Sequence, residues 1–293
     1  MNRQAHGVTV RPKIVVAGSG AAGLACAARL ADEVDVIVVE RLPAAGGEEW
    51  EHPVLCEHAR QAADAGAQFL LGTQAIRWDS SHVLAIGQES AAIDAAAVVV
   101  ATGHRPLTRW ELGLYGPRCA GVLSGTVALH LLRHRVRLGD APIVVGGGAL
   151  AASIAHGLLT NGARKITVVA PDGQTPDVTW PQDIQLYDGA SPVAIDGFGR
   201  VCAVDVSVGG GTIRLACDAM ILAHGSVPLR NIDGAISRAP GVIFAQGEGS
   251  GAAAAEDLGA RAAEETLTML AGVPVEHHTA VRGGRDESLE SRW

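Results

Sequence analysis

Lys13-Ile-Val-Val-Ala-Gly-Ser-Gly-Ala-Ala-Gly23 is the stretch that decides the fold. Residues 14–17 are apolar and mostly β-branched, as in a strand that is buried on both faces. The glycine-rich run 18–23 follows directly, and residues 24–30 have the small and apolar side chains of a closely packed helix. A second apolar run, residues 34–39, ends at Glu40. The order strand, glycine turn, helix, strand predicts the βαβ unit of a dinucleotide-binding fold.

Each part of this fingerprint has a physical role. Gly18 permits a tight turn, Gly20 lets the backbone approach a pyrophosphate, and Gly23 lets the helix lie close to the strand. The free N–H groups at the start of the helix attract phosphate. Glu40 lies 22 positions after Gly18, where a carboxylate binds ribose hydroxyls and repels a 2′-phosphate.

The second half of the chain repeats this pattern. Residues 141–145 resemble a buried strand, Gly146-Gly-Gly-Ala-Leu-Ala151 matches G-x-G-x-x-A, and a predicted helix and a strand at 165–170 follow. Residues 98–106 and 220–228 each combine an apolar strand pattern with A-x-G-x-x-P. We therefore predict two successive units of the same kind.

This order resembles that of the two-dinucleotide-binding-domain flavoproteins, the pyridine-nucleotide-disulfide oxidoreductase superfamily, with thioredoxin-reductase-like proportions. The resemblance rests also on Glu40-Arg-Leu-Pro-Ala-Ala-Gly-Gly47, on Ala101-Thr-Gly103 and on the late segment 241–251. It implies FAD in the first unit and NAD(P)H in the second. The FAD-binding residues that the fingerprint and the resemblance indicate are Gly18, Ser19, Gly20, Ala21, Ala22, Gly23, Glu40, Arg41, Gly46, Gly47, Ala101, Thr102, Gly103, Gly247 and Glu248.

The predicted fold class is α/β, with two Rossmann-like three-layer domains. The NAD(P)-type domain, residues 114–225, is inserted into a discontinuous FAD domain, residues 1–113 plus 226–272. A helix is expected from residue 252 to about residue 270, and residues 273–293 form a predicted flexible tail.

Two departures from the family pattern concern the second unit. The sequence has no CxxC pair, so the dithiol shuttle of thioredoxin reductases does not carry over. Ala170 stands where the first unit has Glu40, so the ribose carboxylate is missing at that position, and Asp172, two residues on, is a candidate to substitute for it. The second unit therefore either binds NAD(H) or NADP(H), or is degenerate, and both interpretations stay open. Its candidate residues are Gly146, Gly148, Ala149, Leu150 and Ala151.

FAD would perform the redox step itself, so no conventional nucleophile is required. Trp50 and His52, just after the Gly-Gly pair, and His104 are candidates for residues near the flavin ring or the substrate. Each is also an ordinary type of packing or surface residue. The five cysteines lack the usual zinc and iron–sulfur spacings, and we predict no metal site.

The predicted function is that of an FAD-dependent oxidoreductase without a redox dithiol. It would transfer hydride or electrons, through the flavin, between an acceptor and either a pyridine nucleotide or a small organic substrate of the amine or amino-acid type. Residues 116–132 loosely resemble flavoprotein α-subunits of sarcosine oxidase, opine oxidase, hydrogen cyanide synthase and dye-linked proline dehydrogenase. The alternative is therefore a non-catalytic or electron-relay subunit of a multisubunit amine or amino-acid dehydrogenase.

Composition limits the partners. The 293 residues carry a formal net charge of −8 and show no basic cluster, which argues against nucleic-acid binding. The longest apolar stretch, residues 143–159, contains four glycines and predicts no membrane span. The amino terminus lacks a signal-peptide pattern, and we expect a cytoplasmic protein. The expected partners are a small-molecule substrate or an electron-acceptor protein, with a second dehydrogenase subunit in the alternative interpretation. We also expect an oligomer.

Overall fold

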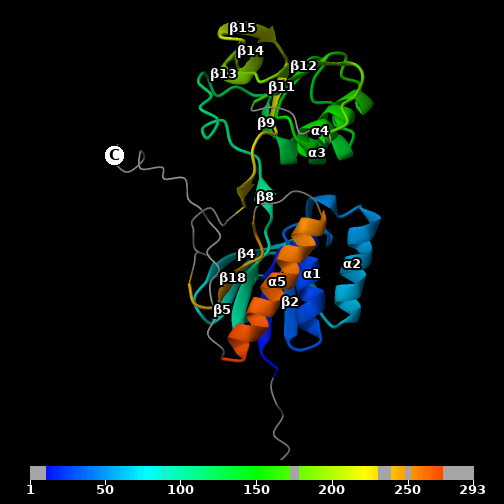
Figure 1. Cartoon of the computed structure of the whole chain (residues 1–293), viewed down its shortest axis with the longest axis vertical. Coiled ribbons are helices and arrows are strands. Elements are labelled where there is room, and N and C mark those ends of the chain that lie inside the picture. The colour runs from blue at the N-terminus through cyan, green and yellow to red at the C-terminus, as the bar shows by residue number, and fades with distance from the viewer. Residues whose placement is uncertain (1–10, 89, 172–177, 230–238, 248–251, 273–293) are drawn as a thin grey trace, which may run out of the picture.

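The computed structural model describes residues 11–88, 90–171, 178–229, 239–247 and 252–272. They form two lobes, each built around a five-stranded parallel sheet (Figure 1). The sheet of the first lobe has the order β18 (Val242–Phe244), β7 (Ala97–Val100), β1 (Lys13–Ala17), β2 (Asp35–Val39) and β3 (Gln68–Leu70).

The first lobe has three layers. One face of its sheet carries α1 (Ala21–Ala31), α2 (Pro53–Asp64) and α5 (Ala252–Leu270). The other face carries the antiparallel meander β4 (Thr73–Trp78), β5 (His82–Gly87) and β6 (Ala91–Asp94). Ile14 and Val16 pack in the helix-side core, whereas Val15 and Ala17 pack in the meander-side core. Burial on both faces explains why β1 is apolar without interruption.

The second lobe repeats these layers. Its sheet has the order β12 (Ile184–Asp188), β11 (Ile166–Ala170), β10 (Pro142–Val145), β16 (Ala219–Leu222) and β9 (Val122–Ser124). Helices α3 (Gly125–Arg133) and α4 (Ala149–Thr160) cover one face. The meander β13 (Ser191–Phe198), β14 (Arg200–Val208) and β15 (Gly211–Ala216) covers the other. The predicted α/β class with two three-layer Rossmann-like domains is confirmed.

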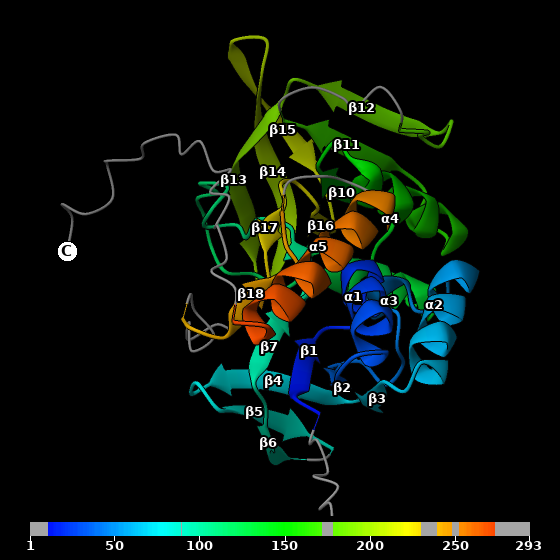
Figure 2. The same cartoon turned by 60° about the horizontal axis from the view of Figure 1, so that its bottom comes forward.

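The first lobe is completed by chain that follows the second. β18 pairs in parallel with β7, and α5 lies against α1, where a Cβ on Gly259 would come within 2.1 Å of the Ala22 carbonyl oxygen. Figure 2 shows α5 beside α1 from a second direction. Two short antiparallel strands, β8 (His104–Arg105) and β17 (Val227–Pro228), connect the lobes. The second lobe is thus an insertion in the first.

Several boundaries agree closely with the sequence analysis. The strand at 13–17 and the helix at 252–270 are confirmed, and the predicted strands at 141–145 and 165–170 each begin one residue later. Sequence reasoning did not identify either meander. The predicted flexible tail, residues 273–293, lies outside the described residues.

Candidate functional site

Backbone contacts hold the first glycine turn in place. The Gly18 N–H donates to the Val39 carbonyl at 2.8 Å, and a Cβ on Gly18 would lie 2.4 Å from the Ala101 oxygen. The φ angle of Gly18 is +103°, a region that other residues rarely adopt. A Cβ on Gly23 would lie 2.0 Å from the Gly18 oxygen. Both positions therefore require glycine for the fold itself.

Gly20 differs from these two glycines. Its φ and ψ angles, −67° and −176°, are open to any residue, and it is the N-cap of α1. No heavy atom other than those of its chain neighbours lies within 4 Å of the position that a Cβ would take. Packing therefore does not exclude a side chain at residue 20, and the open space there suits the close approach of a bound ligand.

Glu40 is buried at the end of β2, with 4% of its surface exposed. Its Oε2 accepts hydrogen bonds from the Ser19 N–H at 2.9 Å and the Ser19 Oγ at 2.7 Å. Its Oε1 accepts one from the Leu42 N–H at 2.8 Å. Two carboxylate oxygens provide about four lone-pair sites, so these three bonds leave acceptor capacity for a ligand hydroxyl.

The Gly46-Gly47 pair lies directly against this turn. The Gly46 N–H donates to the Ser19 carbonyl at 3.0 Å and to the Ser19 Oγ at 3.1 Å. A Cβ on Gly47 would be 3.1 Å from the Gly20 Cα. A Cβ on Gly46 would be 2.6 Å from the Trp50 Cα, so the backbone of Trp50 packs against this loop. Two segments far apart in sequence thus form one wall of the site.

A cavity of about 1310 Å³ lies over these residues. It is lined by predicted residues of both units: Gly18, Ser19, Gly20, Ala21, Glu40, Arg41, Gly46, Gly47, Ala101, Thr102, Gly103, Gly148, Ala149 and Leu150. Its volume exceeds that of most drug-sized ligand pockets, as a dinucleotide requires. Helix-terminal N–H groups, an open face at Gly20 and a buried carboxylate fit the chemistry of FAD.

Other predicted residues support this wall without lining the cavity. Ala22 and Gly23 lie within α1, behind the turn. A Cβ on Gly247 would meet Leu258 Cδ2 at 3.0 Å, which places Gly247 against α5. Glu248 lies outside the described residues.

The second glycine turn has the same backbone design. The Gly146 N–H donates to the Val169 carbonyl at 2.8 Å, and a Cβ on Gly146 would lie 2.5 Å from the Ala223 oxygen. Gly148, like Gly20, has nothing within 4 Å of the position of a Cβ. Gly146 and Ala151 do not line the large cavity.

Among the described residues, the second turn has no counterpart of the Glu40 carboxylate. Ala170, which occupies the place of Glu40, is fully buried at the end of β11. The structure therefore provides an opening for phosphate at Gly148 but no acid at this strand end. Residues 172–177, which follow, lie outside the described part of the chain.

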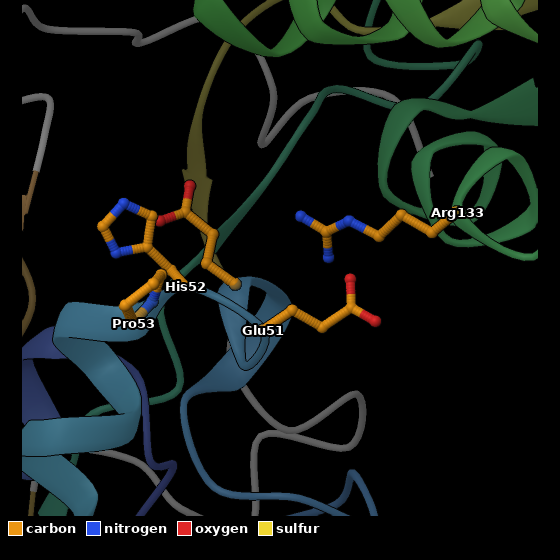
Figure 3. Close-up of a pocket in the computed structure, with 5 residues that line it drawn as sticks. Glu51, His52, Pro53 and Arg133 are labelled. Atoms are coloured by element: carbon orange, nitrogen blue, oxygen red, sulfur yellow. The ribbon is translucent and has the colours of Figure 1, made fainter.

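Of the three candidates for the flavin or substrate region, only His104 lines the large cavity. Burial lowers the pKa of His104, which favours its neutral form. His52 instead lines a smaller cavity of about 470 Å³ together with Glu49, Glu51, Pro53 and Arg133 (Figure 3). There Arg133 of α3 donates a hydrogen bond to the Glu48 carbonyl and so links the two lobes. Trp50 lines neither cavity.

Sequence reasoning did not single out several residues of the cavity wall. Leu107, Thr108 and Arg109 after β8, and Arg118, Cys119, Ser124 and Thr126 around β9, all line it. The segment 116–132 gave a signal through its resemblance to flavoprotein subunits, but that signal did not indicate which of its residues face the site.

Within the described ranges, no three His, Cys, Asp or Glu side chains are grouped as metal ligands. No helix there is both long and apolar enough to cross a bilayer.

The fold and the paired glycine turns define the class of two-domain dinucleotide-binding flavoproteins. Residues 12–175 match the family model for pyridine nucleotide-disulphide oxidoreductases. This match covers more than half of the chain, and the protein belongs to that family, whose members are flavin-dependent oxidoreductases. No curated protein matches the sequence.

Solved structures share the fold at low sequence identity. Thioredoxin reductase from Lactococcus lactis, in its FR conformation, aligns over 90% of this chain and 100% of its own, with 18% identity and a TM-score of 0.67. Thioredoxin reductase from T. acidophilum gives 17% identity and a TM-score of 0.64 over 89% and 99% of the two chains. L-proline dehydrogenase from P. horikoshii gives 18% identity and 0.66, over 92% of this chain but 57% of its own.

Proposed function

We propose that this chain binds FAD in the large cavity, through the first glycine turn and Glu40. The observation that carries the proposal is the contrast among the three glycines. Gly18 and Gly23 are enforced by backbone contacts, whereas Gly20 opens onto the cavity and no packing contact excludes a side chain there. A dinucleotide diphosphate lying against the backbone would need that open space.

The surrounding residues would bind and orient the cofactor. The N–H groups of residues 20–22 at the start of α1 would donate to the diphosphate, aided by the positive end of the helix. Glu40, oriented by Ser19 and Leu42, would accept from ribose hydroxyls. The Gly46-Gly47 loop would cover the same end of the cofactor. Bound FAD supplies hydride and electron transfer, so the protein needs no nucleophile of its own.

The reaction partner would occupy the part of the same cavity that the second lobe lines. Gly148 and the start of α4 could hold the phosphates of NAD(H) or NADP(H). A small organic substrate of the amine or amino-acid type is the other candidate for this volume. His104, a neutral imidazole on the cavity wall, could exchange a hydrogen bond or a proton with either of them.

A second candidate function is an electron-relay or non-catalytic subunit of an amine or amino-acid dehydrogenase. The fully buried Ala170 favours it, because the described part of the second turn has no acid where Glu40 stands in the first. The likeness to a proline dehydrogenase chain that is much longer than this one is compatible with a role beside other components. Either function is compatible with the proposed domains, which are an FAD domain of residues 1–113 plus 226–272 and an NAD(P)-type domain of residues 114–225.

Anaerobic titration of the purified protein with NADH and NADPH tests these alternatives. Bleaching of the flavin absorption by either nucleotide supports the stand-alone enzyme, and Gly148→Val should then abolish bleaching while the protein stays yellow. A yellow protein that neither nucleotide reduces favours the subunit. A folded protein that is colourless and does not take up added FAD would overturn the whole proposal.

A further inference from the structure

Three of the five cysteines gather in the second lobe, although none is close to another in sequence. Cys202 lies in β14, Cys217 directly follows β15, and Cys119 lies in the loop before β9. Cys217 is 7% exposed and packs in the core under the meander, and Cys119 packs against the same core. Cys202 is exposed to solvent.

The backbone sets Cys202 and Cys217 opposite each other. β14 and β15 are antiparallel, and their register ends at Ala203 with Ala216, so Cys202 and Cys217 are the next residues beyond that pair. The Cys217 N–H donates to the Cys202 carbonyl at 3.0 Å, which confirms that the pairing continues. Residues in such a hydrogen-bonded pair have Cα atoms about 5.5 Å apart, within the ~4.4–6.8 Å that a disulfide spans.

The other neighbour of β14 adds to this arrangement. On β13, the adjacent residues Asp196 and Gly197 pair with Ala203 and Val201, so Cys202 is the extra residue of a β-bulge. A bulge re-aims the side chain of the residue it contains. Cys202 is therefore an exposed thiol on a residue whose backbone is hydrogen-bonded to that of the buried Cys217.

The two thiols differ in protonation and in access to solvent. Burial, followed by the smaller electrostatic effects of Asp218, Cys202 and Cys119, raises the pKa of Cys217 to about 12. Cys217 therefore stays protonated at neutral pH, and an oxidant meets Cys202 first, because that thiol is the exposed one.

We propose that Cys202 and Cys217 form a reversible disulfide when the protein meets hydrogen peroxide. The Cys202 thiolate attacks one peroxide oxygen, the O–O bond breaks, and the hydroxide that leaves takes up a proton as water. The Cys217 sulfur then attacks the sulfur of the resulting sulfenic acid. The S–S bond forms, the S–O bond breaks, and the Cys217 proton leaves with the hydroxyl group as a second water. Two thiols and one peroxide thus give one disulfide and two waters.

This proposal is independent of the proposed flavin chemistry, because it needs neither a cofactor nor the large cavity. Tryptic cleavage separates the two cysteines, Cys202 into the peptide 201–214 and Cys217 into the peptide 215–230. The full-length protein is treated with a small excess of peroxide, its remaining thiols are alkylated, and non-reducing digests are analysed by mass spectrometry. We expect a linkage between these two peptides, the loss of two of the five thiols per chain, and recovery with dithiothreitol.

Variants make the outcome specific. Cys202→Ser should abolish the linked peptide, whereas Cys56→Ser removes another exposed cysteine and should leave it intact. Cys217→Ser should let Cys202 advance to the sulfinic acid, a gain of two oxygens in the peptide 201–214. A linkage of the peptide 119–133 to 215–230 would overturn the proposed pairing. Sulfinic acid at Cys202 in the parent protein, a dimer linked through Cys202, or five surviving thiols would also overturn it.

Discussion

Replacing Gly20 with alanine separates the needs of the fold from those of the ligand. The backbone at residue 20 suits alanine, and the new methyl group would meet no atom within 4 Å beyond its chain neighbours. The main structural cost is a poorer N-cap for α1, about 1 kcal/mol or less. We therefore expect Gly20→Ala to fold with nearly the stability of the parent protein.

The same methyl group would enter the cavity where we place the diphosphate. It would push the phosphates away from the N–H groups at the start of α1. The loss of one charge-assisted hydrogen bond costs about 1.5–3 kcal/mol, which corresponds to roughly 10- to 150-fold weaker binding. Quenching of flavin fluorescence on titration of the apoprotein with FAD measures this change, and circular dichroism and thermal unfolding verify the fold.

Two matched variants complete this test. Gly148→Ala makes the same change at the open position of the second turn and should leave FAD affinity within about twofold of the parent protein. Gly23→Ala would place a Cβ 2.0 Å from the Gly18 carbonyl and should destabilise the protein by about 1–3 kcal/mol or more through overpacking. Unchanged FAD affinity in a folded Gly20→Ala protein would refute the argument that the ligand, and not the fold, requires this glycine.

Three further substitutions test buried or charged contacts. Glu40→Gln replaces an acceptor with an amide that cannot serve all three donors, and we expect about 1–3 kcal/mol lower stability by urea unfolding. Asp218→Asn disturbs the carboxylate that accepts from the N–H groups of residues 140 and 141, at 2.6 and 3.0 Å, and should lower the melting temperature by several degrees. Arg105 and Thr108 lower the pKa of Glu111 from 4.5 to about 2, so its contribution to stability is present above pH 4.5 and is lost as the pH falls toward 2. Glu111→Gln should therefore flatten the decline of stability in that pH range, and an unchanged slope would argue against this ion pair.

The core of each unit could be predicted from sequence because both faces of its sheet are buried. Strands such as β1 and β10 contain almost only apolar residues, and the glycine turns follow them directly. The meanders escaped prediction for the opposite reason. Strands such as β13 and β15 have one face toward solvent and contain glycine, proline or charged residues, so their alternation is irregular.

The shared cavity could not be predicted, because it depends on how the two lobes face each other. That arrangement is fixed by two-residue strands, β8 and β17, and by single contacts such as that of Arg133 with the Glu48 carbonyl. None of these has a recognisable sequence pattern. For the same reason, the sequence could not predict the different places of His52 and His104, although both follow glycine segments. His52 lines the small cavity with Arg133 of the other lobe, whereas His104 lines the large cavity.

The duplicated turns show which parts of the motif serve the fold and which serve the ligand. In both units, the N–H of the first glycine donates to a carbonyl near the end of the second strand at 2.8 Å. A Cβ on Gly18 would clash with the Ala101 carbonyl, and a Cβ on Gly146 would clash with the Ala223 carbonyl. These backbone constraints are retained in the second unit. Glu40 is not, since a fully buried Ala170 takes its place without disturbing the sheet. The sheet of such a unit therefore does not require a carboxylate at this strand end, and the presence of Glu40 in the first unit argues for a ligand there that the second unit does not bind in the same way.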